Sequence, residues 1–141
     1  MKNALIVLIA LLIVSCNKAP QPLVAGQDEC SFCKMPMAEI KFGAEIITVK
    51  GKIYKFDDIG CMSNFLKSVF SKNEKVQSVL VVNYADDKKF MTAHESLFLK
   101  SETLHSPMNS GIAAFDSRNK AESFLGSNPG EIMSWEQIQK R

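Results

Sequence analysis

Residues 44–66 read AEIITVKGKIYKFDDIGCMSNFL, and this stretch decides the fold. It contains two β-rich runs, 44–49 and 53–56, joined by Lys50-Gly51-Lys52. A turn-sized connection with a glycine between two such runs predicts a β-hairpin. Asp57-Asp58 then supplies a helix N-cap, because a short carboxylate side chain can accept a hydrogen bond from the free N–H groups of the first helical turn.

The expected helix after Asp58 is about twelve residues long and amphipathic. A third β-rich run follows at 76–84, reading VQSVLVVNY. The first half of the chain is therefore predicted as β-β-α-β. The apolar residues of the helix recur at helical spacing on one face: Ile59, Met62, Phe65, Leu66 and Val69.

The second half is predicted to repeat this order. Residues 96–99 and 112–115 are strand candidates, Asp116-Ser117 starts a short helix, and 131–134 returns as a strand. The pattern F-D-[DS]-x6-F-L begins at Phe56 and occurs again after an offset of 59 residues.

Each half, residues 28–85 and residues 86–141, is too small to bury its apolar surface well alone. We therefore expect an α+β fold in which two similar β-β-α-β halves pack as one small unit. The alternative is a single α+β domain without internal symmetry.

The first residues predict export. An eleven-residue apolar run at 4–14 fits the core of a signal peptide, but it is too short for a transmembrane helix, which needs about 20 residues. The run ends Leu12-Ile13-Val14-Ser15-Cys16, which resembles a bacterial lipobox. We expect residues 1–15 to be a lipoprotein signal peptide, Cys16 to carry the lipid, and residues 16–27 to form a tether. The alternative is ordinary signal cleavage that leaves Cys16 free.

The composition is that of one globular domain. The chain has 141 residues, 46% of them hydrophobic and 23% charged, which excludes wholesale disorder and a large multidomain enzyme. Its formal net charge is +2, without a basic stripe, so nucleic-acid binding is not expected. The sequence has no nucleophile elbow, phosphate-binding glycine loop or isolated pair of carboxylates, so it predicts a binding protein and not an enzyme.

The candidate metal-binding residues lie close together in residues 28–37, DECSFCKMPM, which hold two thiols and two thioethers. Soft sulfur donors prefer Cu(I). Cys33 and Met35 are two residues apart, so an extended backbone places both sulfurs on one side. With Cys16 lipidated, an exported chain keeps Cys30, Cys33 and Cys61, and this odd number leaves at least one thiol outside any intramolecular disulfide.

Two other chemistries compete for the Cys-x-x-Cys pair. Zinc needs two further ligands, for which the sequence offers Cys61, His94 and His105, and zinc leaves the two methionines unexplained. Dithiol redox chemistry places Cys-x-x-Cys at the start of a helix. Here the pair follows the predicted tether and precedes Pro36 and a β-rich run.

Together these features resemble the NosL family, the lipoproteins associated with nitrous-oxide reductase assembly. The resemblance rests on the lipobox, the Asp-x-Cys-x-x-Cys-x-Met loop, the hairpin after it, and Pro107-Met108-x-Ser-Gly with Ile112-Ala-Ala-Phe115 in the second half. It runs over most of residues 28–138 and implies a Cu(I)-binding metallochaperone with two β-β-α-β halves. The family usually has glycine at the position of Lys34, so this chain places a cation beside the metal.

Carried over by position, the resemblance implies Cys33 and Met35 as the primary copper ligands. Met108 is the candidate third donor, because Pro107-Met108 opens the second half as the Cys-x-Met loop opens the first. The alternative for Met108 is a packing role. Cys30 either binds copper, forms a reversible disulfide with Cys33, or shapes the loop.

The remaining donors are weaker candidates. His94 and His105 lie in polar segments and are expected to be solvated surface residues. Asp86-Asp87-Lys88-Lys89 is expected to form a turn. Four other sulfur residues are expected to pack in the interior: Cys61, Met62, Met91 and Met133.

The sequence therefore predicts a membrane-anchored metallochaperone that faces an extracytoplasmic compartment of a bacterial cell envelope, with Cu(I) as its cargo. Its expected partners are copper ion, the membrane and, by resemblance, apo nitrous-oxide reductase or the machinery that matures it. One alternative is a lipid-anchored thiol-disulfide oxidoreductase that uses Cys30 and Cys33. Another is a structural lipoprotein with an incidental disulfide.

Overall fold

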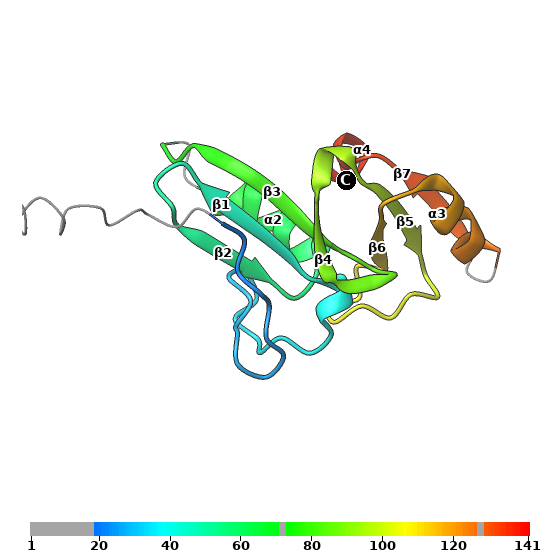
Figure 1. Cartoon of the computed structure of the whole chain (residues 1–141), viewed down its shortest axis with the longest axis horizontal. Helices are drawn as coiled ribbons and strands as arrows, with labels where there is room; N and C mark the ends of the chain where they lie inside the picture. The colour runs from blue at the N-terminus through cyan, green and yellow to red at the C-terminus, as the bar shows by residue number, and fades with distance from the viewer. Residues whose placement is uncertain (1–18, 71–72, 127–128) are drawn as a thin grey trace, which may run out of the picture.

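The computed structural model describes residues 19–70, 73–126 and 129–141, so the predicted signal peptide and Cys16 lie outside the described residues. The described chain forms two antiparallel sheets that lie side by side (Figure 1). Among the described residues, no helix has the length and apolar composition that a membrane crossing requires.

The first sheet has the strand order β2-β1-β3-β4. Its strands are β1 (Ala44–Thr48), β2 (Ile53–Phe56), β3 (Val76–Asn83) and β4 (Asp86–Thr92). The predicted hairpin is confirmed, since β1 pairs with β2 from Ala44↔Phe56 to Ile47↔Ile53. A short 3-10 helix, η1 (Ile40–Phe42), precedes β1.

The helix α2 (Ile59–Ser68) follows β2 and begins where the sequence predicts. Asp58 is its N-cap and accepts a hydrogen bond from the Gly60 N–H at 2.7 Å. The predicted apolar face is buried at Ile59, Met62 and Phe65.

The second sheet has the strand order β6-β5-β7. Its strands are β5 (Leu97–Ser101), β6 (Ile112–Phe115) and β7 (Gly130–Met133), with the helix α3 (Arg118–Leu125) between β6 and β7. Strands β5, β6 and β7 occupy the same places in their sheet as β1, β2 and β3 occupy in theirs. The prediction of two similar β-β-α-β halves is confirmed.

The repeated aromatic residues occupy equivalent positions in the two halves. The Phe56 and Phe65 rings lie 5.2 Å apart between centroids, and the Phe115 and Phe124 rings lie 5.5 Å apart. The main buried cluster draws on both halves, from Ile46 and Phe65 to Phe98 and Trp135. The halves therefore share one hydrophobic core, as their small size requires.

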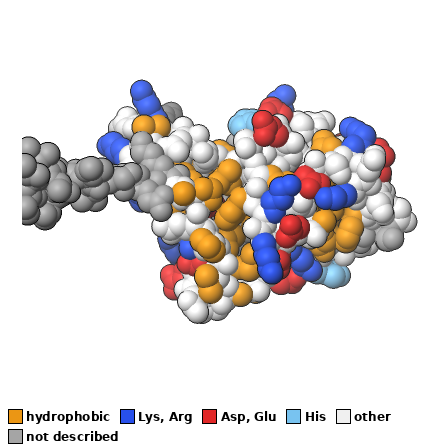
Figure 2. Space-filling view, in the orientation of Figure 1, with side chains coloured by type: hydrophobic (Ala, Val, Ile, Leu, Met, Phe, Trp, Pro, Cys, Tyr) orange, Lys and Arg blue, Asp and Glu red, His pale blue; other side chains and the backbone are white. Residues whose placement is uncertain are grey.

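The prediction of a turn at Asp86-Asp87-Lys88-Lys89 is wrong, because these residues begin β4. The turn lies just before them, at Tyr84 and Ala85. Strand β4 pairs with β3 in the first sheet, although the predicted boundary between residues 85 and 86 places it in the second half. The strand was missed because it is a solvated edge with polar side chains, and charges of both signs gather on the face that carries it (Figure 2).

The N-terminal stretch from Gln21 to Gln27 is docked on the body, so it cannot serve as the flexible part of the predicted tether. Leu23 is buried against Met37 and Val82. The Gln21 N–H donates to both carboxylate oxygens of the buried Glu45, at 3.2 and 3.3 Å. Burial raises the pKa of Glu45 to about 7.

Two short helices complete the fold. The 3-10 helix η2 (Ala93–Glu95) connects β4 to β5. The helix α4 (Trp135–Gln139) was not predicted, and it begins with a capping box between Ser134 and Gln137.

Candidate metal centre

Residues 29–36 form a closed loop that carries the Cys-x-x-Cys-x-Met motif. Glu29 and Pro36 form a β-bridge at its base. Inside it, the Cys30 N–H donates to the Met35 carbonyl at 2.9 Å, and the Lys34 N–H donates to the Cys30 carbonyl at 3.0 Å. Lys34 has a φ of 64°, a left-handed conformation that glycine adopts most easily. We call residues 29–36 the metal loop.

Strand β2 holds the metal loop through Lys55. The Lys55 carbonyl accepts from the Ser31 N–H at 2.7 Å, and the Lys55 N–H donates to Ser31 Oγ at 3.2 Å. The Lys55 ammonium donates to the Asp28 carboxylate at 2.8 and 2.9 Å and to the Pro22 carbonyl at 3.0 Å. One side chain therefore joins the N-terminal stretch to the residue that precedes the metal loop.

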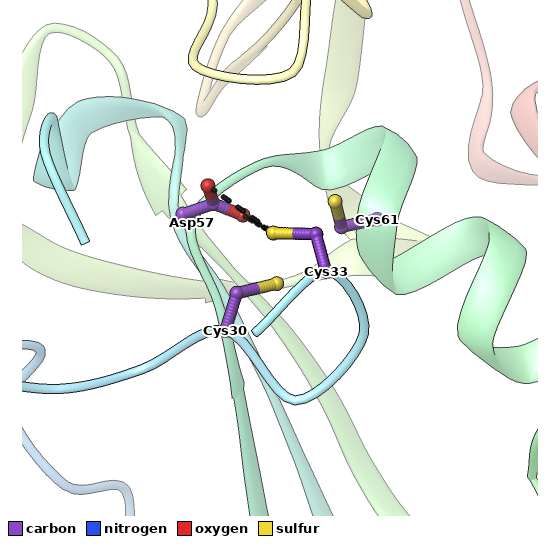
Figure 3. A group of neighbouring side chains, drawn as sticks. All are labelled: Cys30, Cys33, Asp57 and Cys61. Carbon is purple, nitrogen blue, oxygen red and sulfur yellow. Dashed lines mark hydrogen bonds between the residues drawn. The ribbon is translucent and has the colours of Figure 1, made fainter. Parts of the chain in front are cut away.

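Three thiols and one carboxylate converge beneath this loop. The ligand atoms of Cys30, Cys33, Asp57 and Cys61 all lie within 4.8 Å of one another. Figure 3 shows Cys30 and Cys33 arriving from the metal loop, Asp57 from the end of β2, and Cys61 from α2. Cys30 and Cys61 are buried, whereas Cys33 is partly exposed.

The junction of β2 and α2 places two of the four groups. Asp58 caps the helix, which leaves the neighbouring Asp57 to face the thiols. Cys61 lies in the first turn of α2, so its thiol meets the Asp57 side chain where the strand passes into the helix. The Cys33 thiol donates to the Asp57 carboxylate, with Sγ 3.7 Å from Oδ1 and 3.8 Å from Oδ2.

The four groups shift one another's proton affinity. The Cys61 thiol donates a hydrogen bond that lowers the pKa of Cys30 and raises the pKa of Cys61 itself. Burial raises the pKa of Asp57 to about 7, with a further contribution from Cys30. Burial also raises the pKa of Cys33. Cys30 is thus the most readily ionised of the three thiols, which favours it as a thiolate ligand for a metal ion.

This donor set suits a soft or borderline metal ion. Thiolates bind Cu(I) and Zn²⁺, and a carboxylate can complete a zinc site but is a poor ligand for Cu(I). The sequence offers Cys61, His94 and His105 as further zinc ligands, but it has no second Cys-x-x-Cys and no His-x3-5-His pair. The structure brings Cys61 and Asp57 to Cys30 and Cys33, so four donors of the kind that zinc uses lie together.

The predicted ligands fall into two groups. Cys30 and Cys33 belong to the cluster of Figure 3. Met35 and Met108 are 52% and 42% exposed. The Met108 N–H donates to the Asp58 carboxylate at 3.1 Å, which holds this residue at the start of α2. The thioethers therefore lie toward solvent, on segments that adjoin those carrying the thiols.

The weaker candidates behave largely as expected. His94 and His105 are exposed, and His94 Nδ1 lies 3.1 Å from a Glu136 oxygen. Met62 and Met133 are buried, and Met91 is partly buried against the core.

Asp57 is the member of the cluster that the sequence did not indicate, and Cys61 was considered only as a zinc ligand or a packing residue. Cys61 is buried as predicted, yet it also faces the other thiols, and Asp57 was considered only as part of a helix cap. The only signal in the sequence was the Asp-x-x-x-Cys spacing across the predicted strand-to-helix junction.

The fold and the cluster define an α+β protein of two repeated halves with a thiol-rich, metal-binding type of centre in the first. The family model of NosL matches residues 22–141, and the chain belongs to the NosL family. This confirms the resemblance found in the sequence.

A solved structure supports the same fold. The crystal structure of the copper chaperone NosL from Shewanella denitrificans is 20% identical in sequence and superposes with a TM-score of 0.71. The match covers 85% of this chain and 95% of that chain. No curated protein matches the sequence.

Proposed function

We propose that the protein is a lipid-anchored, extracytoplasmic Cu(I) chaperone that delivers copper for the maturation of nitrous-oxide reductase. The observation that carries this proposal is the convergence of Cys30, Cys33 and Cys61 at the position of the motif. Membership of the NosL family, and the likeness to a solved copper chaperone, support it.

Cys33 is central to the proposed site, because it is the partly exposed member of the thiol cluster. Cys30 and Cys61 offer buried thiolates, and Met35 and Met108 offer exposed thioethers. A soft, incompletely enclosed site permits ligand exchange, in which a donor from the acceptor enters before the chaperone's donors leave. No covalent bond of a substrate is broken in this process.

Copper transfer requires the metal to be reachable. With Cys30 and Cys61 buried, the acceptor's donor must approach from the side of Cys33 and Met35.

The protein is not an enzyme, in keeping with its family.

The oxidoreductase alternative is disfavoured by the burial of Cys30. A dithiol oxidoreductase needs an accessible, acidic thiol to attack its substrate disulfide. Here the thiol with the lowered pKa, Cys30, is completely buried. The accessible thiol, Cys33, has a raised pKa, so neither cysteine combines the two properties.

Anaerobic titration of the reduced protein with Cu(I), against a competing chelator, tests the function. We expect tight binding by the parent, loss of tight binding in Cys33→Ser, and weaker binding in Met35→Leu without unfolding. Zinc affinity should change little in Met35→Leu, because zinc does not favour thioether ligands. A parent protein that fails to hold Cu(I) would refute the proposal.

The anchor is tested separately. Cys16→Ala should abolish lipid attachment and release the protein from the membrane fraction. Normal membrane partitioning of this variant, with an N-terminus formed at residue 16, would contradict the lipoprotein assignment.

A further inference from the structure

A groove runs beside the metal loop on the side away from β1. It has a volume of about 940 Å³. The metal loop, β2 and α2 all contribute to its walls. Its apolar part is lined by Phe32, Tyr54, Phe65 and Val69.

The position of this groove relates it to metal transfer. Ser31, Phe32 and Lys34, which line it, belong to the metal loop and flank Cys33 in the chain. A protein that reaches Cys33 from its exposed side must cover the surface next to this loop. Val69 also lines the groove and is 57% exposed, so its side chain is available for an apolar contact there.

The edge of β2 offers unused backbone groups in the same groove. The N–H and C=O of Lys55 point away from β1, since both bond to Ser31. Ile53 lies two residues earlier, so its N–H and C=O point the same way. Within the described residues, these two groups of Ile53 have no backbone partner. They can pair with an extended segment of another protein.

The charges at the rim favour an acidic partner. Lys34 and Lys52 line the groove together with one carboxylate, Glu74. Glu74 accepts a hydrogen bond from the Tyr54 hydroxyl at 2.7 Å and lies 4.0 Å from Lys52. Lys34 has no ion-pair partner among the described residues and is exposed beside the metal loop. The groove therefore presents a net positive rim around an apolar floor.

We propose that this groove is the docking site for the protein that accepts the metal, and that the acceptor inserts an extended segment with an apolar side chain and a nearby carboxylate. The proposal rests on the chaperone function proposed above. The segment pairs with the edge of β2 at Ile53, packs on Phe32 and Val69, and places its carboxylate near Lys34 and Lys52. This docking brings the acceptor's metal donor to Cys33.

Two transfer measurements on the Cu(I)-loaded protein test this proposal. The first follows copper passing to apo nitrous-oxide reductase, and the second follows copper passing to a small chelator. Val69→Asp should slow transfer to the enzyme by about tenfold or more, because a charge would face an apolar contact. Transfer to the chelator should stay within about twofold, since no docking is needed.

Val76→Asp is the matched control. Val76 is 38% exposed and lines a different groove, between β3 and α4, so this variant should transfer copper to the enzyme at the parent rate. Lys52→Glu provides a second test that leaves the apolar floor intact. It should slow transfer to the enzyme, and the difference from the parent should shrink as salt is added.

The outcomes separate the two proposals. If the parent transfers copper but Val69→Asp and Lys52→Glu transfer it equally fast, the groove is not the docking site, although the chaperone function stands. If the parent holds no copper or passes none to the enzyme, the proposed function fails and the docking proposal fails with it. If the protein dimerises and Val69→Asp makes it monomeric, the groove belongs to a second copy of this chain and the acceptor proposal is wrong.

Discussion

The two halves of the molecule use the same strand-to-helix junction for different purposes. In the first half, Asp57 is buried and faces Cys61, four residues later, together with the thiols of the metal loop. In the second half, the equivalent Asp116 forms an ion pair with Lys120, four residues later, at 2.9 Å. Lys120 stands at the position of Cys61 when the repeat is aligned.

In both halves, the junction brings an aspartate close to the side chain four residues later. The difference arises because the metal loop covers this pair in the first half, whereas the pair in the second half stays accessible. The metal loop buries Asp57, and burial raises its pKa to about 7. Asp116 remains accessible, and its hydrogen bond with Lys120 lowers its pKa. One junction thus favours a protonated carboxyl in the metal-free protein, and the other favours a carboxylate paired with a lysine.

Removal of the equivalent aromatic residues should have the largest effect. Phe65 is 4% exposed, and Phe65→Ala should lower the free energy of unfolding by about 3–5 kcal/mol. Phe124 is only partly buried, so Phe124→Ala should cost about 1–3 kcal/mol. Chemical denaturation measures both values. Equal losses would show that the halves are packed alike despite their different exposure.

The two aspartates should respond to pH in opposite directions. The folded pKa of Asp57 is raised, so the stability that its neutral form contributes is present at low pH and is lost as pH rises from about 4 to about 7. Replacement by asparagine removes this titration. The stability of Asp57→Asn relative to the metal-free parent should therefore increase by about 2 kcal/mol between pH 5 and pH 8.

Asp116 has a lowered pKa, so its contribution is present above the unfolded pKa and is lost as pH falls through the folded value. Asp116→Asn should be slightly less stable than the parent at pH 7, and this difference should disappear in acid. Unfolding curves between pH 3 and pH 8 measure both variants. The same sign of pH dependence in both would contradict the assigned environments.

Replacing Cys61, or the equivalent residue Lys120, should show which of the two contributes to metal binding. Cys61→Ala should weaken Cu(I) binding by at least about tenfold, or ~1.4 kcal/mol, because one of three converging thiols is lost. Lys120→Ala, the matched change in the second half, should leave copper affinity unchanged. Competition titrations with a Cu(I) chelator make the comparison. Unchanged affinity in Cys61→Ala would remove Cys61 from the site.

The smallest effect concerns two loop residues, one before β1 in the first half and one between β5 and β6 in the second. Lys34 and Asn109 both have a positive φ, 64° and 56°. Lysine is strained there, so Lys34→Gly should raise the free energy of unfolding by about 0.5 kcal/mol after the entropy cost of glycine in the unfolded chain. Asparagine tolerates this conformation, so Asn109→Gly should be about neutral. Thermal unfolding compares them, and a greater gain in Asn109→Gly would contradict this explanation.

Local sequence signals predicted most of the fold. The hairpin around Gly51 and the helix that begins after Asp58 depend on residues close in the chain, and they appear where expected. Strand β4 was missed because its side chains from Asp86 to Lys89 are exposed and carry no apolar alternation. Docking of residues 21–27 was missed because Leu23 finds its apolar neighbours far along the chain, among them Val82.

The candidate site was predicted only in part for the same reason. Cys30 and Cys33 are only three positions apart in the sequence, and their chemistry could be inferred from the motif. Cys61 joins them only after the metal loop folds over the end of β2. A periodic apolar pattern marks a buried cysteine on a helix but cannot show which groups it faces.

If Cys16 carries a lipid, as proposed above, the docked N-terminal stretch would limit how far the protein can move from a bilayer. Gln21 is hydrogen-bonded to Glu45, and it is the fifth residue after Cys16. A fully extended chain of that length spans about 17 Å. With the lipid attached at Cys16, the body would remain within that distance of the headgroups and would search for its acceptor by lateral diffusion in two dimensions. An acceptor far out in the aqueous compartment would have to come to the membrane surface to be loaded.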